Sequence, residues 1–106
     1  MKKLVLLSIL AFSCQSMAAI VSVPSQKISN LRIEGVAGFI GLNNAFESSS
    51  NCGGRVWINL NEEIGRLKYS TAMMAFASGK VVSIRADNEA ARVFNECQLY
   101  DIVVHE

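Results

Sequence analysis

Alternation between apolar and polar residues predicts β-strands along much of the chain. Residues 27–36 (KISNLRIEGV) and 55–60 (RVWINL) alternate with a period of two, as strands with one buried face do. Residues 80–87 (KVVSIRAD) and 97–104 (CQLYDIVV) are rich in β-branched residues and predict two further strands. Residues 20–25 form a short arm that carries the only proline, Pro24.

The first predicted strand has a mostly polar outer side. Its alternation places one group of residues on one face: Ile28, Asn30, Arg32 and Glu34. The other face carries Ser29, Leu31 and Ile33. Gly35, Gly38 and Gly41 follow within an apolar stretch, which predicts bulges or a sharp bend of the kind found in small barrels. Because no helix follows these glycines, they do not form a dinucleotide-binding motif.

The segment between residues 60 and 80 is predicted to be helical. The helix is expected to run from about Ile64 to Ser78, with Gly79 as its C-terminal stop. Asn59 or Asn61 is expected to cap its N-terminus, ahead of two glutamates in the first turn, where the helix dipole favours negative charge.

The order of elements indicates the fold. Residues 43–54 (NNAFESSSNCGG) form the longest predicted loop, and residues 88–96 are expected to be a loop or one helical turn. The order is therefore strand, bent strand, strand, helix, strand, strand, without a repeat or linker. It predicts one α+β domain over residues 20–106, with a small, curved antiparallel sheet of about five strands and one helix packed on it. This order is compatible with a five-stranded Greek-key barrel of the oligonucleotide- and oligosaccharide-binding (OB) type.

Residues 1–19 have the layout of a secretory signal peptide. Two lysines precede an apolar run (LVLLSILAF), and small residues follow it, with cleavage expected after Ala18 or Ala19. The protein is therefore expected to be exported, to the periplasm or beyond. Lipid attachment at Cys14 is an alternative, although the bulky Phe12 fits a lipoprotein signal poorly.

Two cysteines remain after the leader. Cys52 and Cys97 are expected to form a disulfide, because the chain is bound for an oxidising compartment. The alternatives are two free thiols or a metal site, and the latter lacks a Cys-x-x-Cys spacing.

The charge balance argues against a nucleic-acid partner. Without the two leader lysines, eight Lys and Arg (10 minus 2) face nine Asp and Glu, so the formal net charge is −1. A nucleic-acid partner would favour a basic face, and none is visible. The mature chain has no second apolar segment long enough to span a membrane.

The predicted helix is apolar on more than one side. Residues 69–79 carry no charge, and two apolar stripes lie roughly opposite each other: Ile64, Leu67, Thr71, Met74 and Ser78, and Tyr69, Ala72, Met73 and Phe76. One stripe can pack on the sheet of the same chain. We expect the helix to contribute a homo-oligomer interface through Leu67, Tyr69, Met73, Met74 and Phe76. The alternative is a helix buried entirely within its own domain.

Catalytic chemistry finds little support, and we expect a protein that is not an enzyme and that needs no cofactor. The only histidine, His105, lies at a chain end, where fraying is common. Glu62 and Glu63 diverge on a helix and are better suited to its first turn than to a carboxylate pair. Residues 87–89 (DNE) resemble a calcium loop only weakly.

Ligand binding has better candidates. Trp57 shares a strand face with Arg55 and Asn59, opposite Val56 and Ile58. It could stack on a sugar ring, fill a subunit contact, or lie in the core if the sheet closes over it. Tyr100 and the polar loop at residues 43–51 are further candidates.

The chain resembles a group of small exported bacterial proteins in residues 66–84 (RLKYSTAMMAFASGKVVSI). The resemblance includes Cys52, before the preceding strand, and Cys97, at the start of the last strand. The shared pattern of these proteins is Cys, strand, a helix reading Y-S-x-A-x-x-A-x-x-x-G-K-x-V, strand, Cys, strand. That group is similar to the B subunits of AB5 toxins, especially the subtilase-cytotoxin and pertussis-like type. The resemblance covers about half of the chain and implies an oligomer-forming barrel with a glycan ligand. It carries over no sugar-contacting residue.

Together these observations predict an exported, non-enzymatic binding module, a glycan-binding homo-oligomer similar to toxin B subunits. The alternative is a monomeric periplasmic protein that binds or inhibits another protein.

Overall fold

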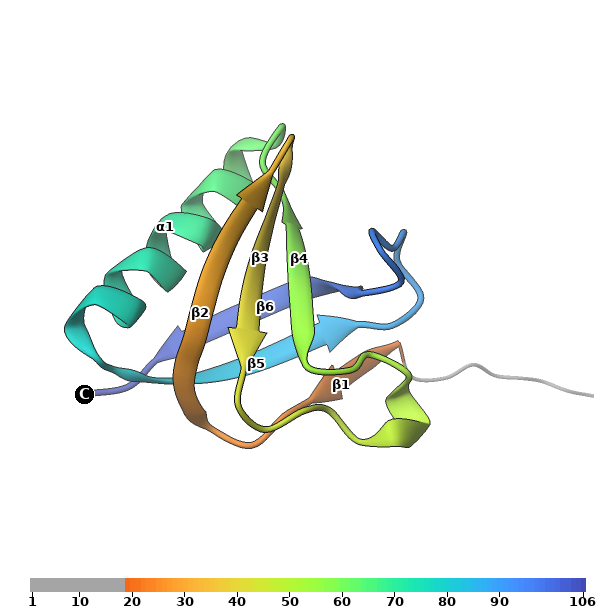
Figure 1. The fold of residues 1–106 in the computed structure, drawn as a ribbon, viewed down its shortest axis with the longest axis horizontal. Coiled ribbons are helices and arrows are strands. Elements are labelled where there is room, and N and C mark those ends of the chain that lie inside the picture. The colour runs from red at the N-terminus through yellow and green to blue at the C-terminus, as the bar shows by residue number, and fades with distance from the viewer. Residues whose placement is uncertain (1–18) are drawn as a thin grey trace, which may run out of the picture.

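The predicted strands form one strongly curved sheet with a single helix against it (Figure 1). The computed structural model describes residues 19–106, so Cys14 and all of the predicted leader except Ala19 lie outside it. The elements in chain order are β1 (Ile20–Ser22), β2 (Gln26–Glu34), β3 (Ala37–Leu42), the short 3-10 helix η1 (Ser48–Ser50), β4 (Arg55–Asn59), α1 (Glu63–Ser78), β5 (Val81–Asp87) and β6 (Cys97–Val104). Among these residues no helix is long and apolar enough to cross a membrane.

The strands close into a ring. β2 pairs with β3, β3 with β4, β4 with β6, β6 with β5, and β5 back with β2. The β4–β6 pairing is parallel and the others are antiparallel, as in a Greek-key barrel of the OB type. The predicted α+β class with a curved sheet is therefore confirmed. The sheet has six strands because residues 20–22 of the arm add β1 to the side of β5.

The ring is uneven, because two of its pairings are short. β2 meets β5 only at Gln26 and Lys27, and β4 meets β6 only at Val56 and Trp57. Figure 1 shows β2, β3 and β4 standing across β5 and β6, with α1 running along one side. The helix contacts β2, β4 and β6, so it covers the region where the ring is least complete.

A register shift in β2 changes which residues reach the core. The pairing with β3 slips between Ile28 and Asn30, which is a bulge or irregularity at Ser29. Ile28 and Leu31 consequently both pack against the core, although strict alternation placed them on opposite faces. The predicted bend is thus present, but it lies in β2 and not at the glycines of β3.

The glycines of β3 provide room for neighbouring side chains. A Cβ atom on Gly38 would lie 2.6 Å from the ring of Tyr69, and one on Gly41 would lie 2.6 Å from the side-chain amide of Asn30. Tyr69 of α1 therefore rests directly on β3, and its hydroxyl donates a hydrogen bond to the carbonyl of Arg32, 3.2 Å away. Burial raises the pKa of the Tyr69 phenol.

The ends of α1 differ in how well the sequence predicts them. Gly79 adopts the left-handed conformation (φ 66°), and its backbone N–H bonds to the last turn, as expected for a helix stop. The prediction for the N-terminus is wrong: Glu62 occupies the cap position and makes no side-chain cap bond. The side chain of Asn59 accepts a hydrogen bond from the backbone N–H of Asn61 instead, so it stabilises the preceding turn.

Candidate functional site

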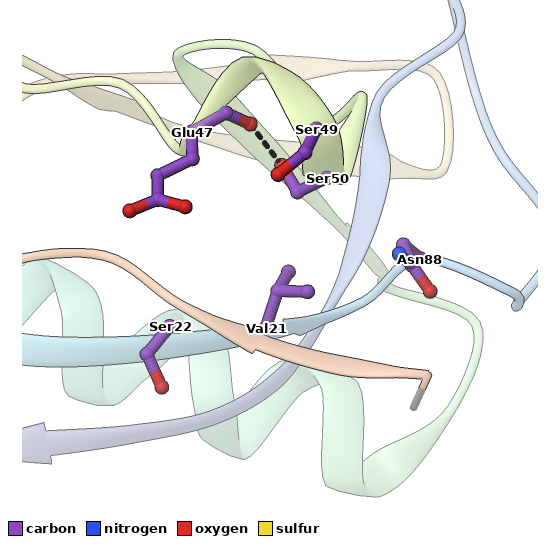
Figure 2. A pocket seen from close by; sticks show the side chains of 6 residues that line it. All are labelled: Val21, Ser22, Glu47, Ser49, Ser50 and Asn88. Atoms are coloured by element: carbon purple, nitrogen blue, oxygen red, sulfur yellow. Dashed lines mark hydrogen bonds between the residues drawn. The ribbon is translucent and has the colours of Figure 1, made fainter. Parts of the chain in front are cut away.

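A pocket of about 410 Å³ lies between β1, the η1 loop and the start of the β5–β6 loop. We call it the β1–η1 pocket. Its lining consists of Val21, Ser22, Glu47, Ser49, Ser50 and Asn88. Figure 2 shows the side chains of Val21 and Glu47 reaching into the space between β1 and the loop, whereas the hydroxyl of Ser22 points away from it. The volume falls in the range of small-molecule sites.

The loop wall of the pocket is fixed by one buried side chain. The amide of Gln26, which is buried at the start of β2, donates to the carbonyl of Asn44 (2.9 Å) and accepts from the N–H of the same residue (2.8 Å). Phe46 is buried in the core and pairs with Gly53 across the loop. The wall is therefore held from inside the barrel and is not a free surface loop.

The disulfide fixes the far end of the same wall. Cys52 and Cys97 are bonded, as predicted, and both are buried. The hydroxyl of Ser50 donates to the carbonyl of Glu47 (2.6 Å) and accepts from the N–H of Cys52 (3.2 Å). The bridge to β6 thus fixes the position of a pocket-lining serine directly.

Asn88 is brought to the pocket by the pairing of β1 with β5, two strands that lie far apart in the sequence. Its backbone N–H donates to the carbonyl of Ala19 (2.7 Å), which extends the β1–β5 ladder by one residue. The guanidinium of Arg92 donates to the carbonyls of Asn51, Asn88 and Asn95 and so ties the β5–β6 loop to the η1 loop. The side-chain oxygen of Asn88 is buried and has no hydrogen-bond partner in residues 19–106.

Trp57, the leading ligand candidate from the sequence, is 7% exposed. It packs with Ala37, Phe39 and Val93 in a small apolar cluster on the outer face of β3 and β4. The indole N–H donates to the carbonyl of Ala91 (3.0 Å), so the loop of residues 88–96 covers the ring. Of the three roles considered, this burial favours the core role and leaves no free ring face for a sugar.

Arg55 and Asn59 have structural partners as well. Arg55 pairs with Glu96 at 2.7 Å and lies 4.3 Å above the ring of Phe39, so it holds the end of the covering loop. Asn59 stabilises the turn before α1, as described above. Arg55, Trp57 and Asn59 share a face of β4, as predicted, but each forms its hydrogen bonds with other residues of the same chain.

Tyr100 lies apart from both regions, on the exposed face of β6. The guanidinium of Arg85 lies 5.3 Å from its ring and donates to the carboxylate of Asp101 (3.0 Å). The hydrogen bond from Arg85 lowers the pKa of Asp101 below its usual range. This exposed pair contributes little to stability, and Tyr100 does not line the β1–η1 pocket.

His105 makes two hydrogen bonds to residues of β5. Its backbone N–H donates to Val81, and its Nε2 lies 2.6 Å from the hydroxyl of Ser83. Glu62 and Glu63 are exposed at the start of α1.

A metal centre is not formed by the side chains that the structure describes. Residues 19–106 contain no group of three or more His, Cys, Asp or Glu side chains placed to hold an ion. In the segment compared with a calcium loop, the carboxylate of Asp87 accepts a hydrogen bond from the backbone N–H of Glu89 and forms a local turn.

The helix exposes part of the surface predicted as an interface. Leu67 and Met74 are 57% and 53% exposed, and Ile64, Met73 and Phe76 are also exposed. We call these five residues the exposed helix flank. Tyr69 is 5% exposed and faces β3, so it lies in the core of its own domain and not on this flank.

Comparisons of the chain with protein-family models, curated proteins and solved structures found no match.

The sequence pointed to part of the pocket. Glu47, Ser49 and Ser50 belong to the polar loop at residues 43–51 that was a candidate for ligand binding. Val21, Ser22 and Asn88 were missed, because their place in the pocket depends on β1 pairing with β5. A usable signal was the arm itself, whose apolar residues alternate like those of a strand.

Proposed function

We propose that this protein is an exported, non-enzymatic binding module that takes a glycan in the β1–η1 pocket and assembles as a homo-oligomer similar to toxin B subunits. The observation that carries the proposal is the pocket itself. It combines hydroxyl, amide and carboxylate groups with the apolar side chain of Val21. Sugars present hydroxyl groups and apolar C–H faces together, and such a mixed lining suits both. Loops of OB-type barrels commonly bind oligosaccharides.

A variant that fills the pocket is expected to weaken glycan binding at least tenfold, corresponding to about 1.4 kcal/mol. Ser49→Trp places a large ring at an exposed position in the lining, so it blocks the space without disturbing the core. The measurement is binding of the mature protein to a glycan array, followed by a dissociation constant for the best glycan. Ser48→Trp is the matched control, because Ser48 is exposed on the same turn but does not line the pocket. Equal loss in both variants, or no bound glycan at all, would count against the proposal.

The exposed helix flank supports the proposed oligomer. Its five apolar side chains are exposed on one helix, which carries no charge from Tyr69 to Ser78, and covering them in an assembly removes apolar area from water. The same flank favours the second candidate function, a monomeric periplasmic protein that binds or inhibits another protein. The state of the protein in solution distinguishes the two.

The mature protein is expected to be oligomeric at micromolar concentration, and Leu67→Glu with Met74→Glu is expected to convert it to monomers. Two carboxylates in a desolvated contact are costly, whereas on an exposed surface they are tolerated. Size-exclusion chromatography with light scattering gives the mass of each form. Asn43→Glu, in an exposed loop outside the helix, is the control and should leave the mass unchanged. A monomeric wild-type protein would favour the second function.

A further inference from the structure

The β1–η1 pocket has an uneven distribution of charge. Among its lining residues, Glu47 is the one with an ionisable side chain, and the others offer hydroxyl, amide or apolar groups. Glu47 makes no ion pair with a basic side chain in residues 19–106. Its carboxylate is therefore free to accept hydrogen bonds from whatever occupies the pocket.

The cation that holds the pocket wall, Arg92, makes its hydrogen bonds to the protein backbone. Arg92 donates through both terminal nitrogens to the carbonyls of Asn51, Asn88 and Asn95, and it does not line the pocket. The hydroxyl of Ser50 is likewise engaged, with the carbonyl of Glu47. What the pocket offers a ligand is a carboxylate acceptor, the Ser49 hydroxyl, the side-chain nitrogen of Asn88 and the apolar surface of Val21.

This lining suits a ligand with hydroxyl donors and no negative charge. A carboxylate accepts hydrogen bonds from two neighbouring hydroxyls, one on each oxygen, and charge-assisted bonds of this kind are stronger than neutral ones. A ligand carboxylate or phosphate in the same space of about 410 Å³ would lie close to Glu47 and be repelled by it. Val21 provides contact for the C–H face of a sugar ring.

We infer that the β1–η1 pocket selects a neutral, hydroxyl-rich sugar unit over one that carries a carboxylate, and that Glu47 determines this selection. The inference rests on the proposed glycan-binding function and specifies its ligand class. The Glu47 carboxylate accepts from sugar hydroxyls and excludes sialic and uronic acids by like charge.

The test compares matched pairs of glycans on the mature protein. Each pair shares one backbone and differs in its terminal unit, which is galactose or glucose in one member and galacturonic, glucuronic or sialic acid in the other. Wild type is expected to bind the neutral member at least about tenfold more tightly. Glu47→Gln is expected to weaken neutral binding and to bring the ratio close to one. Glu63→Gln makes the same charge change at the exposed start of α1 and should preserve the wild-type ratio.

The outcomes separate this inference from the function on which it rests. Binding of the acidic member as tightly as the neutral one, or more tightly, would overturn the charge selection and leave glycan binding intact. An unchanged ratio in Glu47→Gln would overturn the role of Glu47. Failure to bind any glycan, by a wild-type protein shown to be folded by circular dichroism, would overturn the proposed function and this inference with it.

Discussion

Replacing Cys52 and Cys97 together with alanine is expected to lower the free energy of unfolding by about 4 kcal/mol. The bond closes a loop with a sequence separation of 45 residues, and chain-entropy reasoning gives this magnitude for a loop of that length. The domain after residue 19 has 87 residues (106 minus 19), and chains of this size have total stabilities of about 4–13 kcal/mol. The loss is therefore a large fraction of the total, and it is measured by urea unfolding of both proteins.

The position of the bond adds a functional consequence. The disulfide holds Cys52 against β6, and the backbone N–H of Cys52 donates a hydrogen bond to the hydroxyl of Ser50. Breaking the disulfide is therefore expected to loosen the loop wall of the pocket. Ligand affinity is therefore expected to fall even at temperatures where the double variant remains folded. Wild type treated with a reductant is the control, since it removes the bond without changing either residue. A double variant within about 1 kcal/mol of wild type would contradict the expected stabilisation.

The sequence predicted the strands well because their signal is local. Arg55 to Asn59 alternate as expected, with Val56 and Ile58 in the main core and Trp57 on the other face. Whether that other face is exposed is not a local property. It is covered by the loop at residues 88–96, whose carbonyl at Ala91 lies 34 positions from Trp57. Alternation assigns a residue to a face, and distant chain segments decide whether that face is exposed.

The bulge in β2 shows a second limit of periodicity. A single register slip between Ile28 and Asn30 reverses the faces of all later residues, since side chains alternate with a period of two. Leu31 therefore reaches the core. Ile33 shares the face of Leu31 but is exposed, next to the hairpin turn. No residue in this strand marks the slip, because Ser29 fits a regular strand as well as a bulge.

Only the wall of the pocket that has a local sequence signal was predictable. The polar composition of residues 43–51 marked the loop as a candidate, and Cys52, which follows it, was expected to form a disulfide. The opposite wall comes from β1 and Asn88, which meet through pairing across more than 60 positions of sequence, as in Ile20 with Asp87. Composition identified one wall of the pocket, and the topology of the sheet brings the other wall to it.

Among the described glycines, Gly65 makes the closest approach to a neighbouring backbone, at the end of β4. A Cβ atom built on Gly65 would lie 1.9 Å from the backbone oxygen of Asn59 and 2.9 Å from its carbonyl carbon. A backbone carbonyl cannot rotate out of the way as a side chain can. The first turn of α1 can therefore lie against β4 only while residue 65 has no side chain, and this contact fixes where the helix begins.

Gly65→Ala is expected to lower the free energy of unfolding by roughly 3 kcal/mol or more, because the clash must displace the helix from the sheet. Helix propensity alone predicts the opposite sign, a gain of about 1 kcal/mol for alanine over glycine. Urea unfolding followed by circular dichroism decides between them. Gly54→Ala is the control, since its Cβ would make ordinary contact at 3.7 Å with Ala45, and its effect should stay within about 1 kcal/mol. A stabilised Gly65→Ala protein would show that α1 can shift on β4 without cost, and that this contact does not position the helix.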